Sequence, residues 1–479
     1  MSASLRVSWQ EGVKTSRCDG ELVVAGHGSR TTLREIAPEI ADAIERLAPP
    51  GDGEDQLTER LLAAGKLHSL ARWHYYLDQL GRRGLIRRSL YSGDRLIAME
   101  TPLGGASPPV ARGAPDASYV LSRFAYLRRR GDEFVLESPT SHWRIALYDP
   151  AAIAVVGALV SPSTAGELAN SNGNLEPDAI AALVGLLARS GLAVEVGAGR
   201  EPAEDVDSAL GSWEFHDLLF HARSRRGRFD ATFGGSYRLA HRPPPPAIKA
   251  ISGAETLELY RPDLKRLECD DPPFAAVQER RRSIRTYASQ PVTARQLGEF
   301  LYRVARVKNH WQAEVATPAG TVPMDFASRP YPAGGALYEL EFYLAVRACQ
   351  NLSSGLYYYQ PEPHRLARLA GPTADVERLI DDAASSAGMA AQSMQLLVIL
   401  AARLPRIAWK YESIAYALAL KHVGVVYQTM YLVATAMDLA PCGLGCGDAD
   451  AFAKAAGLDY YAEASVGEFL LGSRRSDQV

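Results

Sequence analysis

The sequence predicts an α+β protein in which two small winged-helix-like domains precede a larger domain with an antiparallel-rich central sheet and long helices. Three observations predict this fold class. The chain has 479 residues, more than one hydrophobic core usually supports. A pattern of helices followed by a two-stranded β-ribbon occurs twice in the N-terminal half. A long apolar helix and several β-rich runs dominate the C-terminal half.

Composition narrows the classes of function. The formal net charge of −3 gives no reason to expect nucleic acid or an anionic membrane as the main partner. The first residues lack the apolar core of a signal peptide, and the longest apolar run, residues 151–160, is too short to span a bilayer. Five cysteines fit reduced thiols better than a disulfide framework. We therefore expect a cytoplasmic protein that binds neither nucleic acid nor membrane.

The first predicted domain covers residues 1–110 and has the order of a winged-helix module. Its main elements are a strand, two helices and a ribbon turn, over residues 21–24, 33–47, 70–80 and 92–94. Residues 111–205 repeat this order more weakly, since 187–192 matches 80–85 in sequence and context. A repeat of this length implies a second, similar domain. The Gly/Pro/Ser-rich segment 104–115 is the predicted linker.

Arginines cluster on both modules, which raises the possibility of DNA binding because winged helices often bind DNA. They are Arg82, Arg83, Arg87, Arg88 and Arg128 to Arg130. The overall balance of charge is close to neutral, so we favour peptide binding or simple packing of solvated faces.

Residues 206–265 are predicted to connect these modules to the C-terminal domain, residues 266–479. His216 and His221 share one predicted helix but lie five residues apart, so they do not face one metal ion as a helical pair would. Four prolines, Pro243 to Pro246, predict a stiff spacer at the boundary. We expect no metal site.

A run of arginines opens the C-terminal domain. A predicted helix over 274–280 leads into Arg281, Arg282, Ser283 and Arg285. Guanidinium groups and a hydroxyl at this spacing could bind a phosphate, because arginine forms bidentate charge-assisted hydrogen bonds. Arginine runs are more often solvated, so the run alone does not decide the matter.

A loop rich in proline and glycine follows, with the sequence SRPYPAGGAL over residues 328–337. The paired Gly334 and Gly335 would let the backbone approach a flat ligand and offer N–H groups to it. The alternative is a plain turn. Runs over 341–346 and 355–359 predict strands.

The domain is organised around residues 404–448. Apolar residues recur at helical spacing from Ile407 to Ala436, and no proline follows Ile407 before Pro441, which predicts one long helix buried on most of its circumference. The helix runs into a glycine loop, Gly443 to Gly447. Cys442 and Cys446 have a CxxxC spacing, for which free thiols are favoured over a metal or redox pair. His422 is interpreted as an interior histidine.

In their order along the chain these motifs resemble the nitroreductase-type flavin fold. The order is RRRSIRTY, SRPYPAGGALYELEFYLAV, GLYYY, the long helix, PCGLGCG and GEFLLG. More narrowly, the chain resembles the FMN-dependent azoline dehydrogenases of ribosomal-peptide pathways, which include the cyanobactin oxidases. The segments WKYESIAYALAL and WEFHDLLFHARSRRGRFD and the N-terminal modules are similar to that subgroup. The resemblance covers residues 206–479 well and 1–205 loosely.

The resemblance implies a homodimer with two FMN molecules at its interface. Contacts to the phosphate, ribityl chain and pyrimidine edge would come from Arg281, Arg282, Ser283 and Arg285. The isoalloxazine would be lined by the other subunit's residues 330–335, including Pro330, Ala333, Gly334 and Gly335. Gln428 would reach the cofactor, and Gly443, Leu444, Gly445 and Cys446 would supply an N–H group near flavin N5. Arg474 or Arg475 would close on the phosphate.

Lys410 and Tyr411 are the expected catalytic residues. Dehydrogenation of an azoline ring needs an acceptor for the acidic Cα–H, while FMN accepts the hydride. A desolvated lysine and a neighbouring phenol suit that task, and the resembling family carries this pair as its proposed catalytic motif. The alternative is that the lysine extends to solvent and the tyrosine packs at a helix start.

The sequence therefore supports one main hypothesis of function and two alternatives. The main hypothesis is FMN-dependent oxidation of thiazoline or oxazoline rings in a ribosomally made peptide, with dioxygen reoxidising the flavin as the family implies. The azoline-containing peptide and the cyclodehydratase that forms its rings are the expected partners. The alternatives are an NAD(P)H-dependent nitroreductase and a non-catalytic winged-helix scaffold or regulator.

Overall fold

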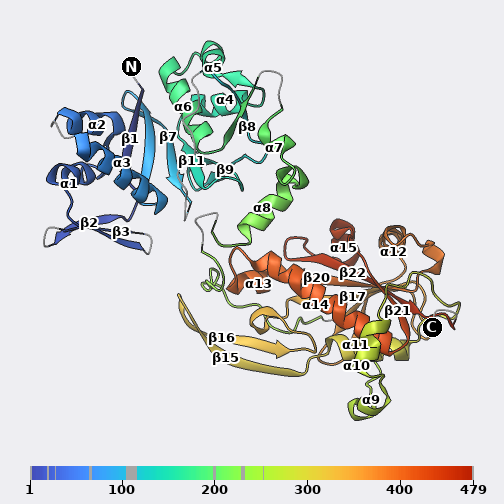
Figure 1. Ribbon diagram of the computed structural model, residues 1–479. Helices are drawn as coiled ribbons and strands as arrows, with labels where there is room; N and C mark the ends of the chain where they lie inside the picture. The colour runs from blue at the N-terminus through green and yellow to red at the C-terminus, as the bar shows by residue number, and fades with distance from the viewer. Residues whose placement is uncertain are drawn as a thin grey trace. The chain divides into compact units, whose positions relative to one another are not determined.

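The computed structural model describes residues 3–18, 21–26, 29–63, 67–103, 116–197, 201–227, 232–251 and 253–476. The chain forms two compact units, Met1–Ala231 and Thr232–Val479 (Figure 1). The predicted linker at 104–115 lies outside the described residues. The compact units part at 231/232 and not at the predicted boundary 265/266.

Unit 1 is built on a seven-stranded antiparallel sheet. In spatial order its strands are β5 (Asp52–Gly53), β1 (Ala3–Trp9), β6 (Ile86–Ser92), β7 (Arg95–Pro102), β11 (Trp143–Leu147), β10 (Glu133–Glu137) and β9 (Tyr126–Arg130). Strand β7 belongs to the first predicted winged-helix-like domain and β11 to the second, and the two strands pair over five residues from Ala98 to Pro102. The two modules therefore share one sheet instead of each having its own.

Helices and two small sheets complete unit 1. The helices are α1 (Pro38–Glu45), α2 (Glu54–Ala63), α3 (Leu67–Arg82), α4 (Pro150–Ala158), α5 (Ala165–Ser171), α6 (Pro177–Arg189), α7 (Ala203–Val206), η1 (Leu210–Ser212) and α8 (Phe215–Arg223). One small sheet contains β2 (Lys14–Cys18), β3 (Glu21–Gly26) and β4 (Ser29–Leu33). The other contains β12 (Ser163–Thr164), β8 (Ser118–Leu121) and β13 (Ala193–Val196). The helix predicted over 33–47 begins only at Pro38, because proline favours an extended residue before it and the first helical position itself.

Unit 2 is built on a second seven-stranded antiparallel sheet, which confirms the predicted sheet type. Its strands in spatial order are β14 (Thr256–Glu258), β19 (Arg365–Ala370), β18 (Gly355–Gln360), β17 (Leu340–Val346), β20 (Leu396–Arg403), β22 (Glu463–Ser473) and β21 (Leu439–Gly443). All of β17 is buried, as expected for a strand covered on both faces.

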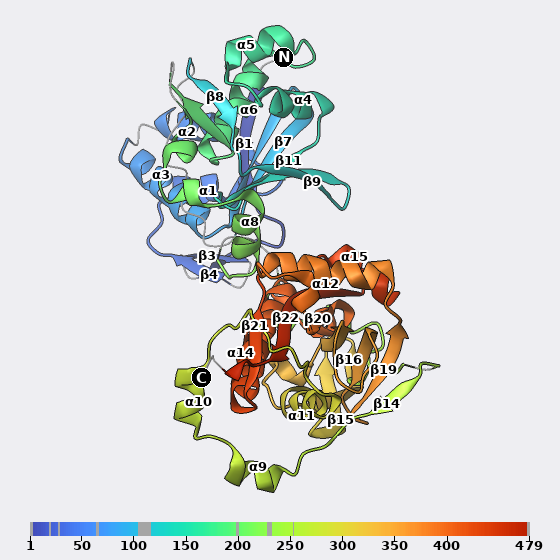
Figure 2. The ribbon, with the colours of Figure 1, turned by 90° about the vertical axis from the view of Figure 1, so that its right-hand side faces the viewer.

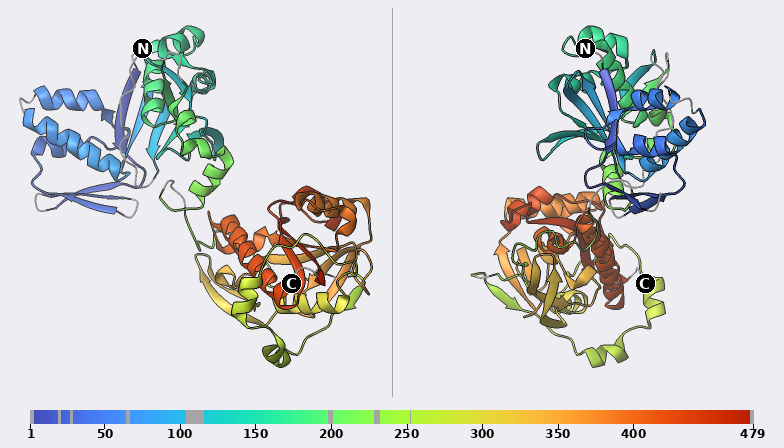
Figure 3. Two further views of the ribbon diagram at one scale, coloured as in Figure 1. Left: turned by 45° about the vertical axis from the view of Figure 1, so that its right-hand side comes forward. Right: turned by 90° about the vertical axis from the view of Figure 1, so that its left-hand side faces the viewer.

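Helices cover both faces of this sheet. On one face, α11 (Ala294–Ala305) and α14 (Ala415–Ala436) pack on Phe342 and Leu344. On the other, α12 (Ala374–Ser386) and α15 (Ala449–Ala456) pack on Tyr343 and Ala345 (Figure 2). The other elements are α9 (Leu264–Asp270), α10 (Phe274–Arg280), β15 (Asn309–Thr317), β16 (Gly320–Ser328), η2 (Gly334–Ala336), η3 (Ala391–Ser393) and α13 (Leu404–Lys410). In Figure 3 the yellow-green α9, which has no buried residue, lies on an arm outside the sheet.

The long helix predicted over the apolar residues from Ile407 to Ala436 is broken. Helix α13 ends at Lys410 and α14 begins at Ala415, while Ser413 between them has a φ of 66°. Nor is α14 buried on most of its circumference: Leu420 is 38% exposed and Val425 36% exposed. No helix in the described ranges is long and apolar enough to cross a membrane.

The predicted proline spacer is a packed part of unit 2. The carbonyl of Pro245 accepts a hydrogen bond from Arg406, and the carbonyl of Arg242 accepts one of 2.9 Å from Trp409. Both donors lie on α13. Because proline leaves its carbonyl free as an acceptor, buried donors can hold this segment in place.

Candidate active site

The break after α13 places Tyr411 outside the helices, next to Lys410 and Gly335. A Cβ atom added to Gly335 would lie 2.7 Å from Lys410 Nζ and 2.8 Å from the Tyr411 hydroxyl. The predicted catalytic pair therefore converges with the glycine turn on one point. Gly335 itself is exposed and has a φ of 62°, a conformation that suits glycine.

Residues 234–237 hold this pair from the other side, although the sequence analysis assigned them no role. The Tyr237 N–H donates to the Lys410 carbonyl at 3.0 Å, and Gly234 pairs with Glu412 as an isolated β-bridge. Lys410 Nζ lies 5.6 Å from the centroid of the Tyr237 ring and 5.4 Å from that of Tyr411. These distances are within cation–π range, so the ammonium group sits between two aromatic rings.

His422 is buried, which agrees with its interpretation as an interior histidine, and its hydrogen bonds connect it to this site. Its Nε2 accepts a hydrogen bond of 2.8 Å from the N–H of Gly334, and its Nδ1 lies 2.6 Å from Glu339 Oε1. We call Gly334, Gly335, Lys410, Tyr411 and His422 the turn group. A lone histidine on an apolar helix gave no sequence signal for this contact.

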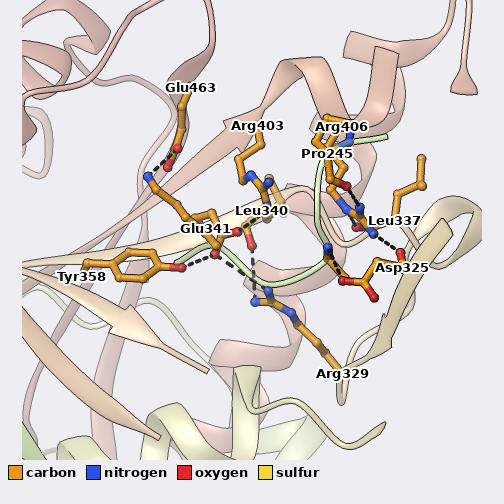
Figure 4. Close-up of polar contacts among 12 residues, drawn as sticks. Pro245, Asp325, Arg329, Leu337, Leu340, Glu341, Tyr358, Arg403, Arg406 and Glu463 are labelled. Carbon is orange, nitrogen blue, oxygen red and sulfur yellow. Dashed lines mark hydrogen bonds and ion pairs between the residues drawn. The ribbon is translucent and has the colours of Figure 1, made fainter. Parts of the chain in front are cut away.

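Buried arginines fix the elements around the turn group (Figure 4). Arg406, one helical turn before Lys410, donates to the carbonyls of Leu337, Pro245 and Asp325. Burial lowers the pKa of Arg406 to about 10. Its three carbonyl partners tie α13 to the glycine turn, the proline segment and β16.

Glu341 on β17 holds the start of the proline- and glycine-rich loop 328–337 in place. It accepts a hydrogen bond of 2.9 Å from the Tyr358 hydroxyl and lies 3.3 Å from Arg403 and 3.8 Å from Arg329 (Figure 4). Arg329 directly precedes Pro330, which was predicted to line the cofactor. A buried carboxylate shared by two guanidiniums and a phenol is well compensated, so this network holds the loop at a defined place.

The predicted phosphate residues gather at the other end of α14. The Ile284 N–H donates to the Pro441 carbonyl at 2.8 Å, which aligns residues 283–285 with β21. Ser283 Oγ lies 2.7 Å from the Tyr431 hydroxyl, which also accepts the Gly443 N–H at 2.7 Å. The Arg281 guanidinium lies 5.2 Å from the centroid of the Tyr431 ring.

Arg285 completes this cluster, since it and Ser283 are both within hydrogen-bonding reach of the Cys442 thiol. Burial raises the pKa of that thiol. We call the cluster the arginine group; it contains Arg281, Ser283, Arg285, Tyr431 and Gly443. No motif in the sequence pointed to Tyr431, which lies among the apolar residues of the long helix.

The four backbone N–H groups of the glycine loop that were predicted to face flavin N5 differ in their hydrogen bonding. The N–H groups of Gly443 and Leu444 donate to Tyr431 and to the Glu468 carbonyl. Those of Gly445 and Cys446 have no hydrogen-bond partner in the described part of the chain. Cys442 and Cys446 are free thiols, as expected.

The other predicted cofactor residues occupy separate positions. Arg474 has a side chain 8% exposed and donates to Asp438 at 2.8 Å, whereas Arg475 is exposed. Gln428 points outward from α14, and Arg282 is exposed beside the arginine group. Pro330 and Ala333 are half-buried in the loop before the turn group.

The turn group and the arginine group lie on opposite flanks of α14. His422 and Tyr431 are nine residues apart, which at about 100° per residue puts their side chains half a turn apart. The rise from His422 to Tyr431 is about 14 Å at about 1.5 Å per residue. The structure thus assembles the predicted residues into two groups and does not bring the groups together within one chain.

The arginine group fits a phosphorylated flavin. In the described ranges, Arg281 and Arg285 have no carboxylate partner. The buried hydroxyl of the neighbouring Tyr287 likewise has no hydrogen-bond partner there. Two uncompensated guanidiniums, a serine hydroxyl and open backbone N–H groups form a donor set that suits an anionic phosphate and the polar edge of a flavin ring.

Two family models match different parts of the chain. The family model described as cyanobactin oxidase ThcOx matches residues 119–230, and the nitroreductase family model matches residues 279–472. The chain joins a cyanobactin oxidase segment to a nitroreductase domain. Both residue groups lie within the nitroreductase domain. These matches confirm the expected enzyme class, an FMN-using oxidoreductase, and the narrower resemblance to azoline dehydrogenases.

Individual relatives match between two fifths and just over half of this chain. A protein of Methanocaldococcus jannaschii whose name assigns it to the nitroreductases is 27% identical over 191 residues, which are 40% of this chain and 85% of that protein. The Escherichia coli microcin synthetase complex with truncated pro-MccB17 bound has a chain that is 19% identical, with 55% of this chain and 92% of that chain covered and a TM-score of 0.34. A nitroreductase-type protein of Desulfovibrio desulfuricans in complex with FMN is 15% identical, with 43% and 89% covered and a TM-score of 0.27.

Proposed function

We propose that the protein oxidises thiazoline or oxazoline rings of a ribosomally made peptide to thiazoles or oxazoles, with FMN as cofactor and with Lys410 and Tyr411 handling the ring proton. The observation that carries the proposal is the convergence of Lys410 Nζ and the Tyr411 hydroxyl on Gly335. The cyanobactin oxidase match in residues 119–230 supports a peptide substrate.

The chemistry divides between cofactor and protein. Oxidation of an azoline removes a proton from one ring carbon and a hydride from its neighbour, and FMN, when bound, accepts the hydride. The chain must therefore hold a base beside the first carbon. The Lys410 amine and the Tyr411 phenol flank an exposed position that carries no side chain, so a flat ring can approach both polar atoms.

We further propose that one active site takes the turn group from one subunit and the arginine group from a second. The separation of the two groups along α14 supports this, because a single chain holds them on opposite flanks. The exposed face of α14 also supports it. Tyr416 is 46% exposed, Leu420 38% and Val425 36%, three apolar side chains spread over the exposed half of a helix that a second copy would cover.

The proposed substrate is an azoline-containing peptide, and the cyclodehydratase that forms its rings is the proposed partner. The winged-helix-like modules of unit 1 are the proposed contact for the peptide or for that enzyme. The ring preference follows from neither residue group, since sulfur and oxygen azolines lose the same two hydrogens.

The test combines a spectrum with a mass measurement. The purified protein is examined for flavin absorbance and then incubated with an azoline-bearing peptide. We expect a yellow protein and a loss of about 2 mass units per ring oxidised. Lys410→Ala and Tyr411→Phe should stay yellow and lose activity by about 100-fold or more, the usual contribution of a general base.

Exposed residues of the same types elsewhere in unit 2 provide the controls. Lys421→Ala and Tyr461→Phe should keep wild-type activity, because both side chains are exposed and neither belongs to the turn group or to the exposed apolar side chains of α14. Unchanged peptide mass with a fully yellow wild-type enzyme would rule out azoline oxidation. Full activity of Lys410→Ala on a nitroaromatic with NAD(P)H would favour a nitroreductase instead.

A further inference from the structure

We propose that His422 and Glu339 are positioning residues that lock the turn Gly334–Leu337 against Lys410 and Tyr411. This inference rests on the proposed function and adds two residues to its site. Neither side chain needs to contact the substrate for this role. Both act through the turn, whose Gly335 meets the catalytic pair.

His422 joins the two ends of the turn. Its Nε2 accepts the Gly334 N–H at 2.8 Å, and its Nδ1 lies 2.6 Å from Glu339, five residues further along the chain. A backbone N–H can only donate, so Nε2 must be an acceptor and the ring proton must be on Nδ1. Glu339 then accepts that proton's hydrogen bond, which fixes both the tautomer and the ring orientation.

Both side chains are buried. Glu339 is 0% exposed and His422 6% exposed, and within the described ranges Glu339 Oε2 has no hydrogen-bond partner. Burying a carboxylate with a single partner is costly. An apolar pair would fill the same space at lower cost, but it could not accept the Gly334 N–H. The polar pair is therefore best explained by its effect on the turn.

The turn needs such a lock because its backbone is strained. Gly335, Ala336 and Tyr338 have φ values of 62°, 54° and 47°, and the last two are in the left-handed region that side chains disfavour. Strained conformations persist only where the surroundings over-determine them. His422 holds the first residue of the turn, and Arg406 binds the carbonyl of Leu337 at its end.

The lock also sets the distance between the turn and the catalytic pair. A Cβ atom added to Gly334 would lie 3.3 Å from His422 Nε2 and 3.7 Å from the Tyr411 hydroxyl. If Gly334 were released, the backbone could relax and Gly335 would move relative to Lys410. Small misplacements of this kind reduce the rate of the chemical step more than they reduce binding.

The experiment measures the turn directly, on the full-length holoenzyme, by hydrogen exchange and mass spectrometry of peptides that cover residues 333–338. His422→Leu should increase exchange there by about tenfold, the effect of losing one buried hydrogen bond. His422→Gln should restore slow exchange, since its side-chain carbonyl can accept the Gly334 N–H. Glu339→Gln should give an intermediate rate, because it still accepts from Nδ1 but without charge.

His364→Leu is the matched control. His364 is also buried and bonds to the Tyr359 hydroxyl and the Tyr260 carbonyl, away from the turn group. Its loss should leave exchange at 333–338 unchanged. Equal exchange in His422→Leu and wild type would overturn the proposal, as would equally fast exchange in the His364→Leu control.

Activity provides a second, separate readout. In His422→Leu we expect kcat for azoline oxidation to fall by about tenfold or more with KM and flavin content nearly unchanged, and His422→Gln to recover most of it. A parallel loss in the Gln variant would contradict a positioning role through Gly334. The exchange measurement needs no substrate, so failure of wild-type azoline oxidation would refute the proposed function and leave the result on the turn intact.

Discussion

Gly335 is the residue at which the turn and the catalytic pair come closest. Its positive φ alone would explain a glycine, but the space around it adds a second reason, because Lys410 Nζ and the Tyr411 hydroxyl occupy the region that a methyl group would enter. The effect of the positive φ and the effect of the crowding can be separated by experiment, since other glycines in unit 2 have a positive φ but open space around them.

Replacing Gly335 by alanine should abolish activity without releasing the cofactor. The new methyl group would lie within 3 Å of both polar atoms and push them apart, so we expect azoline oxidation to fall by about 100-fold. Flavin absorbance should persist, because the arginine group is unaffected. Gly388→Ala is the control: its φ of 67° is equally unfavourable, but nothing lies within 4 Å. Equal losses in the two variants would attribute the effect to backbone strain.

Sequence reasoning identified the residues that carry motifs and missed those that support them. Lys410 and Tyr411, like the paired glycines, are recognisable because their types and order are unusual. Tyr431 and His422 looked like ordinary members of an apolar helix, and their role depends on hydrogen bonds to segments about 90 residues away or more. Periodicity reports burial but not the partner that a buried polar atom meets.

Among the elements, helix boundaries set by local chemistry were predictable and the break before α14 was not. Helix α11 begins at Ala294 because Thr293 and Gln296, both readable in the sequence, form a capping box. The break between α13 and α14 has no proline or glycine. It is held by tertiary contacts instead, including the hydrogen bond from Ser413 Oγ to the Thr232 carbonyl.

Helix α8 is attached to the sheet of unit 1 through one carboxylate. Glu137 on β10 accepts a hydrogen bond of 2.6 Å from Arg223 of α8 and another of 2.6 Å from Arg144 on β11. Burial by itself would raise the pKa of Glu137, but the two guanidiniums outweigh burial and lower that pKa to about 2. Because the folded-state pKa lies below the ordinary value, the ionised carboxylate stabilises unit 1 above about pH 5, and this stabilisation is lost as the pH falls.

Glu137→Gln should therefore remove part of the acid sensitivity of unit 1. Between pH 5 and pH 3 the free energy of unfolding of the wild type should fall by about 2 kcal/mol more than that of the variant. Urea unfolding followed by circular dichroism at several pH values measures both. Parallel curves for the two proteins would show that Glu137 does not titrate as described.

For the whole molecule, the decisive feature is the distance between the turn group and the arginine group. The family resemblance placed both in one active site, with residues 330–335 supplied by the other subunit. Composition and periodicity alone could not reveal such a division, because the separation of the two groups depends on the length and direction of α14 in space.

Val425→Glu should disrupt the proposed dimer. A charge among the exposed apolar side chains of α14 would be desolvated on association, so we expect a shift to monomer in sedimentation velocity together with loss of bound flavin. Val160→Glu is the control, since Val160 in unit 1 is 78% exposed and does not lie on α14. A dimeric Val425→Glu protein that keeps its flavin would contradict assembly through α14.

The pairing of β7 with β11 determines how the protein can be recombined with its relatives. A chimera that joined its halves near residue 110 would split one sheet and leave both β7 and β11 with an open edge, a surface that promotes aggregation. Exchange of the whole segment up to residue 231 keeps every pair in that sheet intact. If unit 1 determines peptide specificity, that specificity should therefore be transferable only by exchanging the whole segment 1–231.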